Sequence, residues 1–347
     1  METINLGDFC QTIQSDLADL AGSNYPAMKR EATGLLDAVV SPANRQGFSQ
    51  EYPVDGGDGK LKQVLVEWIQ PQPVSEMVTS AQDICTPTDP IDPLREIRTL
   101  TGFASTKVIS FTKAHMRKLC DGPSEWRAKI VASHMSGLFR KINQGLVAKY
   151  NAQVGNFIGG VAAGKTVYML DSSGPIKQID PNGAVDIMED MADLGVSDRP
   201  ILVGAGILSR YASLANIGCC NAYGQDVSMA DEGFDWYRDR DVDTILAGSN
   251  NVLAFVPGAV QMATYAQNRG EFGIVHEHFA ESTIVDPVTG LEIDFEMRYD
   301  QCTKTYTMVF FSHYDLFLLP DDMFTDADER DGVNYAFRYT AAEYTGS

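Results

Sequence analysis

The stretch GGVAAGKT, residues 159–166, matches the pattern G-x-x-x-x-G-K-[ST] of loops that bind nucleotide phosphates, with Lys165 and Thr166 at its end. Such a loop needs a buried strand before it and a helix that begins at the lysine. Here the residues after Lys165, TVYMLDSSGP, are β-branched and aromatic and then form a turn, which predicts a strand. We therefore interpret the stretch as a glycine- and alanine-rich turn and predict that Lys165 binds no phosphate.

Two histidines at alternate positions form a second pattern that could do chemistry. In HEH, His276 and His278 would project from one face of a strand. A catalytic zinc site takes three protein ligands, and no third ligand stands at a defined spacing. The acidic stretch DDMFTDADERDG, residues 321–332, has Asp331 where a calcium loop needs glycine. We predict no catalytic, cofactor-binding or metal-binding residues, and leave open whether His276 and His278 hold a metal ion.

The six cysteines form no C-x-x-C pair, which argues against a zinc knuckle or a thioredoxin-like site. In a cytoplasm they are expected to be reduced thiols. The adjacent Cys219 and Cys220 are interpreted as two small packing residues on a helix rather than as a redox pair.

The chain carries a net charge of −20, from 47 acidic and 27 basic side chains among 347 residues. A surface of this charge repels nucleic acid and anionic membranes, because affinity for phosphates comes from clustered Lys and Arg. The N-terminal residues lack the basic and apolar regions of a signal peptide, and no run of about 18 apolar residues is present. We expect a chain that stays in the cytoplasm in which it is made.

The strongest helical signal follows Pro123 and Ser124, which are typical of a helix start. Apolar residues then recur at helical spacing on one face, and about 30 residues would form a rod of about 45 Å. The residues of this face are Val131, Met135, Leu138, Phe139, Ile142, Leu146 and Tyr150. Residues 112–154 also carry eight Lys or Arg against two acidic residues, so the opposite face is either solvated or meets an acidic partner or an enclosed polyanion.

The segments before this helix contain little apolar mass of their own. Residues 1–45 carry a thin helical stripe, formed by Phe9, Ile13, Leu17 and Leu20. In residues 46–111 the turn DGGDG precedes KLKQVLVEWI, which alternates as a strand does. The proline-rich CTPTDPIDPLREI then fits an extended excursion. We interpret residues 46–111 as a long flap that needs a neighbour to pack against.

The segments after the helix alternate in type. VYML and PIKQI are expected to be strands within residues 155–183. Residues 184–270 read as mixed: a helix in AVDIMEDMADLG, a strand in PILVGAG with a helix after it, and a strand in NVLAF that continues as a helix beyond Pro257 and Gly258. Residues 271–347 read as all β, with the turn DPVTG between two alternating strands.

Because no catalytic constellation emerges and several parts need neighbours, the organisation indicates an assembly protein. At this point the chain resembles the major capsid proteins of tailed bacteriophages, the fold named after phage Hong Kong 97. FTKAHMRKLC before the rod helix and RPILVGAGIL resemble family segments. NNVLAFVPGAVQ, DPVTGLEIDFEMRYD and HYDLFLLP resemble the family's return to its peripheral sheet.

The resemblance implies an α+β, Hong Kong 97-like major capsid fold with an N-arm, an extended loop, a long spine helix, and peripheral and axial domains. The implied parts are 1–45 (N-terminal arm), 46–111 (extended β loop), 112–183 (peripheral domain with the spine helix), 184–270 (axial domain) and 271–347 (return to the peripheral sheet and C-terminal tail). The first part is too short for a fused scaffolding domain, so a separate scaffold, or none, is implied.

The implied function is structural and not enzymatic: homo-hexamers and pentamers of the chain would form the icosahedral shell around the double-stranded DNA of a tailed phage. The DNA would be held without sequence-specific contacts, and there would be no membrane partner. Scaffold, portal and decoration proteins are further implied partners. The shell would assemble in the cytoplasm of the bacterial host and end in the virion capsid. Three alternatives stay open: an encapsulin-like nanocompartment subunit, another phage structural protein, and a nucleotide hydrolase that uses Lys165.

Overall fold

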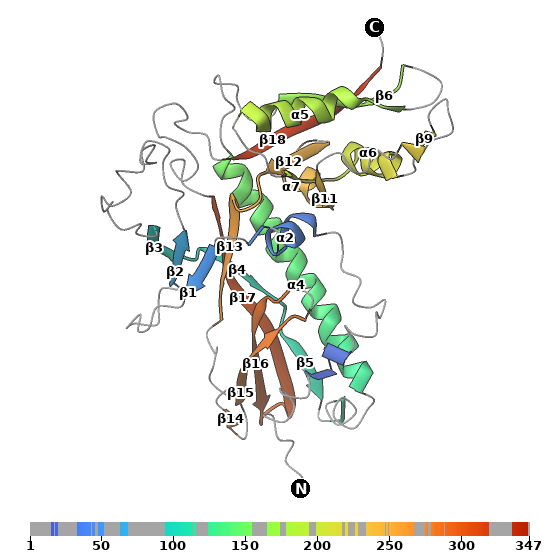
Figure 1. Ribbon diagram of the computed structural model, residues 1–347. Coiled ribbons are helices and arrows are strands. Elements are labelled where there is room, and N and C mark those ends of the chain that lie inside the picture. Colours follow the sequence, from blue (N-terminus) through green and yellow to red (C-terminus); the bar gives the residue numbers. More distant parts are fainter. Residues whose placement is uncertain are drawn as a thin grey trace, which may run out of the picture.

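The structure of the chain is a computed structural model (Figure 1). It describes residues 15–16, 18–19, 33–42, 44–45, 48–51, 63–68, 94–112, 114–115, 124–154, 165–173, 178–193, 199–216, 219–220, 226–227, 234–246, 248, 250–266, 275–276, 279–287, 289–318 and 335–345. The expected stripe of Phe9, Ile13, Leu17 and Leu20 lies outside the described residues. None of the described helices has the length and apolar character needed to cross a bilayer.

One long helix, α4 (Ser124–Gln153), runs diagonally through the molecule (Figure 1). It begins at the predicted start signal, and all seven residues of the predicted apolar face are buried in one core cluster. The prediction of a rod helix with this face is therefore confirmed. A shorter helix, α2 (Gly34–Val39), crosses it and buries Leu35, Leu36, Ala38 and Val39 in the same cluster.

A seven-stranded sheet packs against the lower part of α4, and we call it the lower sheet (Figure 1). Its strands are β4 (Gly102–Ser105), β5 (Ile109–Thr112), β13 (Val260–Tyr265), β14 (Val275–His276), β15 (Phe279–Val285), β16 (Glu292–Asp300) and β17 (Thr305–Leu318). The predicted turn DPVTG joins β15 to β16, with Asp286 accepting hydrogen bonds from the backbone N–H and hydroxyl of Thr289.

The strand β17 is the centre of the lower sheet because four strands share its two edges. It pairs with β16 and β5 over residues 305–308, so these two partners lie on opposite edges. It pairs with β13 and β4 over residues 313–314 in the same way. Along β17 every second side chain, from Tyr306 to Leu316, is buried, and these side chains face α4.

A six-stranded sheet forms the top of the molecule, and we call it the upper sheet (Figure 1). Its order is β11 (Asp235–Arg238), β8 (Ile201–Gly204), β12 (Asn251–Phe255), β18 (Ala336–Tyr344), β6 (Lys165–Asp171) and β7 (Gln178–Ile179). Helices α5 (Pro181–Asp193) and α6 (Ile207–Asn216) cover one face of it. Side chains of β8 and β12 on the opposite face, such as Ile201 and Phe255, join the core cluster of α2 and α4.

The long helix therefore holds both sheets together. At its C-terminal end, the buried hydroxyl of Tyr150 lies 2.9 Å from the carbonyl oxygens of Ala254 in β12 and Phe337 in β18. Three smaller units complete the described part: the sheet of β1 (Phe48–Glu51), β2 (Gln63–Trp68) and β3 (Leu94–Thr99), the pair β9 (Cys219–Cys220) and β10 (Asp226–Val227), and helix α7 (Val242–Ile245).

The structure contradicts two expectations. The segment after Gly258 is strand β13, not a helix, because its residues pair with β17. Cys219 and Cys220 lie in a strand, not on a helix. Strands β6 and β18 both lie in the upper sheet, in which β18 pairs with β12 along one edge and with β6 along the other. Residues 34–39 of the expected arm are core residues. The α+β class is confirmed, whereas the division into five parts stays a prediction.

Candidate functional site

Lys165, the lysine of the phosphate-loop pattern, is the first residue of strand β6. Its Nζ lies 2.8 and 3.0 Å from the two carboxylate oxygens of Asp190 in α5. The same carboxylate accepts a hydrogen bond of 3.0 Å from the hydroxyl of Tyr339, and burial together with this negative charge raises the pKa of Tyr339. The prediction that the residues after Lys165 are extended is confirmed. Lys165 thus fastens α5 to the sheet, and the glycines at 159, 160 and 164 lie outside the described residues.

The structure describes no metal site at the residues that the two metal-binding patterns of the sequence singled out. Only the backbone of His276 is described, in β14, and His278 and the acidic residues 321–332 lie outside the described residues. Among the residues that are described, no three His, Cys, Asp or Glu side chains gather as metal ligands do. The question of a metal at the two histidines is thus not tested.

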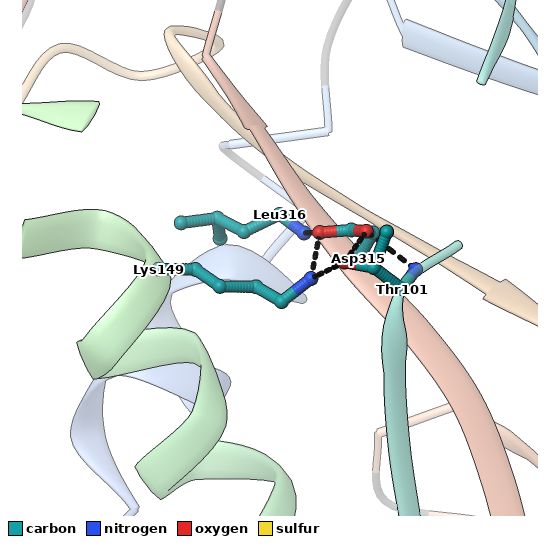
Figure 2. Close-up of polar contacts among 4 residues, drawn as sticks. All are labelled: Thr101, Lys149, Asp315 and Leu316. Carbon is teal, nitrogen blue, oxygen red and sulfur yellow. Dashed lines mark hydrogen bonds and ion pairs between the residues drawn. The ribbon is translucent and has the colours of Figure 1, made fainter. Parts of the chain in front are cut away.

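A polar cluster joins α4, β17 and the start of β4, and Figure 2 shows it. The Asp315 carboxylate accepts hydrogen bonds of 2.8 Å from the backbone N–H and the hydroxyl of Thr101, and another from the N–H of Leu316. The ammonium group of Lys149 contacts both Asp315 and Thr101. Burial raises the pKa of Asp315, but the hydrogen bonds from Lys149 and Thr101 outweigh it and hold this pKa below its usual value.

This cluster anchors the chain where it leaves the β1–β2–β3 sheet, because Thr101 lies two residues after β3 ends. Asn44 anchors the chain where it enters this sheet. It lies four residues before β1 and is fully buried. The Asn44 amide donates to the carbonyl oxygens of Val39 and Val260, and its side-chain oxygen accepts from the N–H of Gly258. The three-stranded sheet therefore forms a protrusion whose first and last residues are hydrogen-bonded to the rest of the subunit. Val64 and Val66 of this sheet are buried in the core cluster of the upper sheet.

A third cluster ties helix α2 to the body. The Asp239 carboxylate, which is fully buried, accepts hydrogen bonds of 2.9 Å from the Leu35 N–H and the Asn143 amide, and one of 2.8 Å from the Asp241 N–H. Burial raises the pKa of Asp239 above its usual value. Arg140 of α4 pairs with Asp241, so a second basic residue of the long helix, besides Lys149, forms an ion pair within the chain. Sequence reasoning missed these clusters, although an acid inside an apolar run, as in HYDLFLL, is a signal of a buried pairing.

Aromatic side chains gather on sheet faces that the described helices do not cover. On the lower sheet, opposite α4, the ring centroid of Phe103 lies 6.2 Å from that of Phe311 and 5.0 Å from that of His313. We call these three residues the lower aromatic cluster, and Phe103 is 55% exposed. On the upper sheet, Tyr168 and Tyr344 meet edge to face, with centroids 6.1 Å apart.

A cleft of about 570 Å³ lies where α6 begins, beside the end of β18. Its lining includes Gly206, Arg210, Asn250 and Glu343, and the side-chain oxygen of Asn250 accepts a hydrogen bond of 3.3 Å from the Ile207 N–H. The lining holds no Ser, Cys or His that could act as a nucleophile or base among these described residues. The polar groups of the cleft are the charged side chains of Arg210 and Glu343, the Asn250 amide and the Thr340 hydroxyl.

Comparison with known proteins gives similarity in structure only. No family model and no curated protein matches the sequence. Among solved structures, the chain is similar to one of the cyanophage A-1(L) capsid, at 9% identity and a TM-score of 0.45 over 81% of this chain and 88% of that chain. It is similar to a chain of Mycobacterium phage Adephagia (13%, 0.43, 82% and 85%) and to one of the mature capsid of bacteriophage PhiM1 (11%, 0.41, 81% and 82%).

Proposed function

We propose that this chain is a structural, non-enzymatic subunit that self-assembles into the icosahedral capsid shell around the double-stranded DNA of a tailed phage. The observation that carries the proposal is that exposed apolar side chains lie on several separate surfaces. They are the lower aromatic cluster, the tyrosine pair of the upper sheet, Val185 and Met188 on α5, and Ile97 on the protruding sheet. A subunit of a closed shell meets several neighbours at once and needs one surface for each.

The parts of the chain take on roles that follow from their contacts. Helix α4 packs against both sheets, and hydrogen bonds of Asn44 and Thr101 hold the chain on either side of the β1–β2–β3 sheet, so this sheet is the part that contacts a neighbouring subunit in our proposal. The net charge of −20 keeps a shell of such subunits from adhering to its own DNA. The sequence resemblance supports the same function.

The partners follow from the proposal. The chain binds copies of itself in hexamers and pentamers, while scaffold, portal and decoration proteins bind the assembled or assembling shell. Packaged DNA lies inside without sequence-specific contacts. Assembly takes place in the cytoplasm of the bacterial host, and the final location is the virion capsid. The division into arm, extended loop, peripheral domain, axial domain and return segment belongs to this proposal, with β6 and β18 in the upper sheet.

Electron microscopy of the purified chain tests the proposal. We expect closed shells of uniform diameter. The substitution Phe103→Glu adds a charge to the lower aromatic cluster and should abolish shells while the circular dichroism spectrum of the subunit stays unchanged, since Phe103 is half exposed. Thr244→Glu adds the same charge at an exposed position of α7 and serves as the matched control.

Two results would overturn the proposal. One is a chain that stays monomeric at all concentrations and salt conditions, alone and when coexpressed with the genes beside its own. The other is nucleotide hydrolysis by the monomer that Lys165→Ala abolishes. The content of the particles separates a capsid from a nanocompartment, because a nanocompartment encloses an enzyme and a capsid encloses DNA or scaffold.

A further inference from the structure

Two glutamates lie directly opposite each other on adjacent strands of the lower sheet. In the antiparallel pairing of β15 with β16, Glu281 is the register partner of Glu296. Residues in this position project to the same face of a sheet with their Cβ atoms roughly 5 Å apart, and like charges there destabilise the pairing. The sheet therefore carries a repulsive pair at a point where most cross-strand pairs add stability.

The same face of these strands provides one compensating positive charge. Arg298 of β16 donates a hydrogen bond of 2.9 Å to the Glu296 carboxylate. Asp294, two residues from Glu296 on the other side, adds a further negative charge. Arg298 is the only arginine or lysine in β15, β16 and β17. On this face β17 places uncharged side chains beside β16: Thr307, Val309 and Phe311.

The other titratable residues of this part of the sheet lie at its borders. Glu292 is at the far end of the pairing, and Asp300 is hydrogen-bonded within the turn that follows β16. His313 belongs to the lower aromatic cluster, and His276 lies on β14, of which the backbone is described. None of these four is opposite Glu281, so Glu296 is the acidic residue directly across from it.

Strand β15 depends on β16 for most of its strand pairing. All seven residues of β15 pair with β16, whereas the described part of β14 pairs with two of them, Phe279 and Ala280. Residues 281–285 therefore have one strand partner among the described residues. The repulsive pair lies within this single pairing, so it weakens the attachment of the outer edge of the sheet.

Protonation removes the repulsion. Burial raises the pKa of Glu281 above its usual value of 4.5, the negative charges of Glu296 and Asp294 raise it further, and Arg298 lowers it in part. Because the pKa is raised in the folded chain, the folded state takes up this proton at a higher pH than the unfolded chain does. The pairing of β15 with β16 therefore becomes more stable as the pH falls from neutral toward 4.5.

We propose that the Glu281–Glu296 pair is a proton-sensitive latch for the outer edge of the lower sheet. With both carboxylates ionised, β14 and β15 separate from β16 more readily, and one proton taken up by the pair holds them in place. Separation exposes backbone N–H and C=O groups of β16, and such an edge is a template for pairing with another chain. The latch concerns the single subunit, so it does not depend on the proposed function.

Hydrogen–deuterium exchange of the purified chain at about pH 7.5 and about pH 5 tests the latch. Protection is expressed relative to the intrinsic exchange rate at each pH, with α4 as the internal reference. We expect the protection of β15 to rise by about two- to threefold at the lower pH, a small factor because water screens a partly exposed pair. In Glu281→Gln, which removes the charge and keeps the shape, protection should be high at both pH values.

A matched control removes one negative charge elsewhere. Glu189→Gln changes an exposed glutamate of α5 and should keep the pH dependence of the parent. Glu296→Gln removes the other half of the pair and should behave as Glu281→Gln does. Protection of β15 that does not change with pH in the parent would overturn the latch. A pH dependence that survives in both glutamine variants of the pair, or one that disappears only in His276→Gln, would overturn it as well.

Discussion

Two glycines of helix α4 should respond in opposite ways to the same substitution. Gly145 faces β17, where a Cβ atom would lie 1.9 Å from the hydroxyl oxygen and 2.9 Å from Cζ of Tyr314. Tyr314 is 4% exposed, so its ring has little room to move away. Gly137 lies on the same helix with no atom within 4 Å of its Cβ position. The pair therefore compares one substitution in a packed and an open environment.

The expected magnitudes follow from these distances. Replacing glycine by alanine inside a helix stabilises the folded state by about 1 kcal/mol in both variants. In Gly145→Ala, the Tyr314 hydroxyl oxygen must move away by roughly 1.6 Å to reach a van der Waals contact of about 3.5 Å with the new methyl group. Overpacking of this kind costs about 1–3 kcal/mol. Because the helix term is common to both variants, the difference between their free energies of unfolding isolates this packing cost.

Urea denaturation of the unassembled subunit, followed by tryptophan fluorescence, measures both free energies. We expect Gly137→Ala to be more stable than the parent, and Gly145→Ala to be less stable than Gly137→Ala by about 1–3 kcal/mol. Combining Gly145→Ala with Tyr314→Leu should remove most of this difference. Equal stabilisation by both alanines would refute the close approach of α4 to β17 at Tyr314.

Three further predictions use single contacts. Tyr150→Phe should lower the free energy of unfolding by about 1–2 kcal/mol, because two buried carbonyl groups lose their shared donor; urea denaturation measures it. The pKa of Asp315 lies below its ordinary value of 3.8, so the ionised carboxylate stabilises the fold above pH 3.8 and this stabilisation is lost as the pH falls below that value. Asp315→Asn should therefore make the free energy of unfolding depend less on pH in this range. An unchanged pH dependence would contradict the polar cluster. Lys165→Met removes the ion pair with Asp190 and should lower the free energy of unfolding by at most about 1 kcal/mol. Calorimetry should detect no nucleotide binding to either the parent or this variant. Thr166→Ala serves as the control that should change neither quantity.

Local patterns in the sequence predicted several elements correctly. The sequence predicted the apolar face of α4 because its period of 3.6 residues persists from Val131 to Tyr150, about 5.5 turns, and because the helix has a strong start signal. Strand β6 could be read because Thr166, Val167 and Tyr168 favour extended backbone whatever surrounds them. The hairpin of β15 and β16 followed from alternation on both sides of a turn. Each of these depends on residues that are close together in the chain.

The segment Val260–Tyr265 shows where local patterns end. Its first four residues are all buried, so it shows neither the alternation of a strand nor the polar side of a helix. Pairing with β17, about 50 residues later, decides that it is a strand. The same holds for β18, which takes its place in the upper sheet only through β12 and β6.

The candidate sites depend on the tertiary structure to a greater degree than the elements do. The sequence predicted that Lys165 does not belong to a phosphate loop, because the residues after it favour a strand where that loop requires a helix. It did not identify Asp190 as the partner of Lys165, nor Thr101 and Lys149 as partners of Asp315. Residues up to 214 positions apart form these clusters, and no periodicity links them.

The sequence by itself determined the types of most of the main elements and the excess of negative charge. Only the tertiary structure decided which faces stay bare and which polar groups clamp the protrusion. The physical reason is that helical and strand preferences act between residues near in the chain. Burial and polar pairing, in contrast, act between surfaces that meet only after the chain has folded.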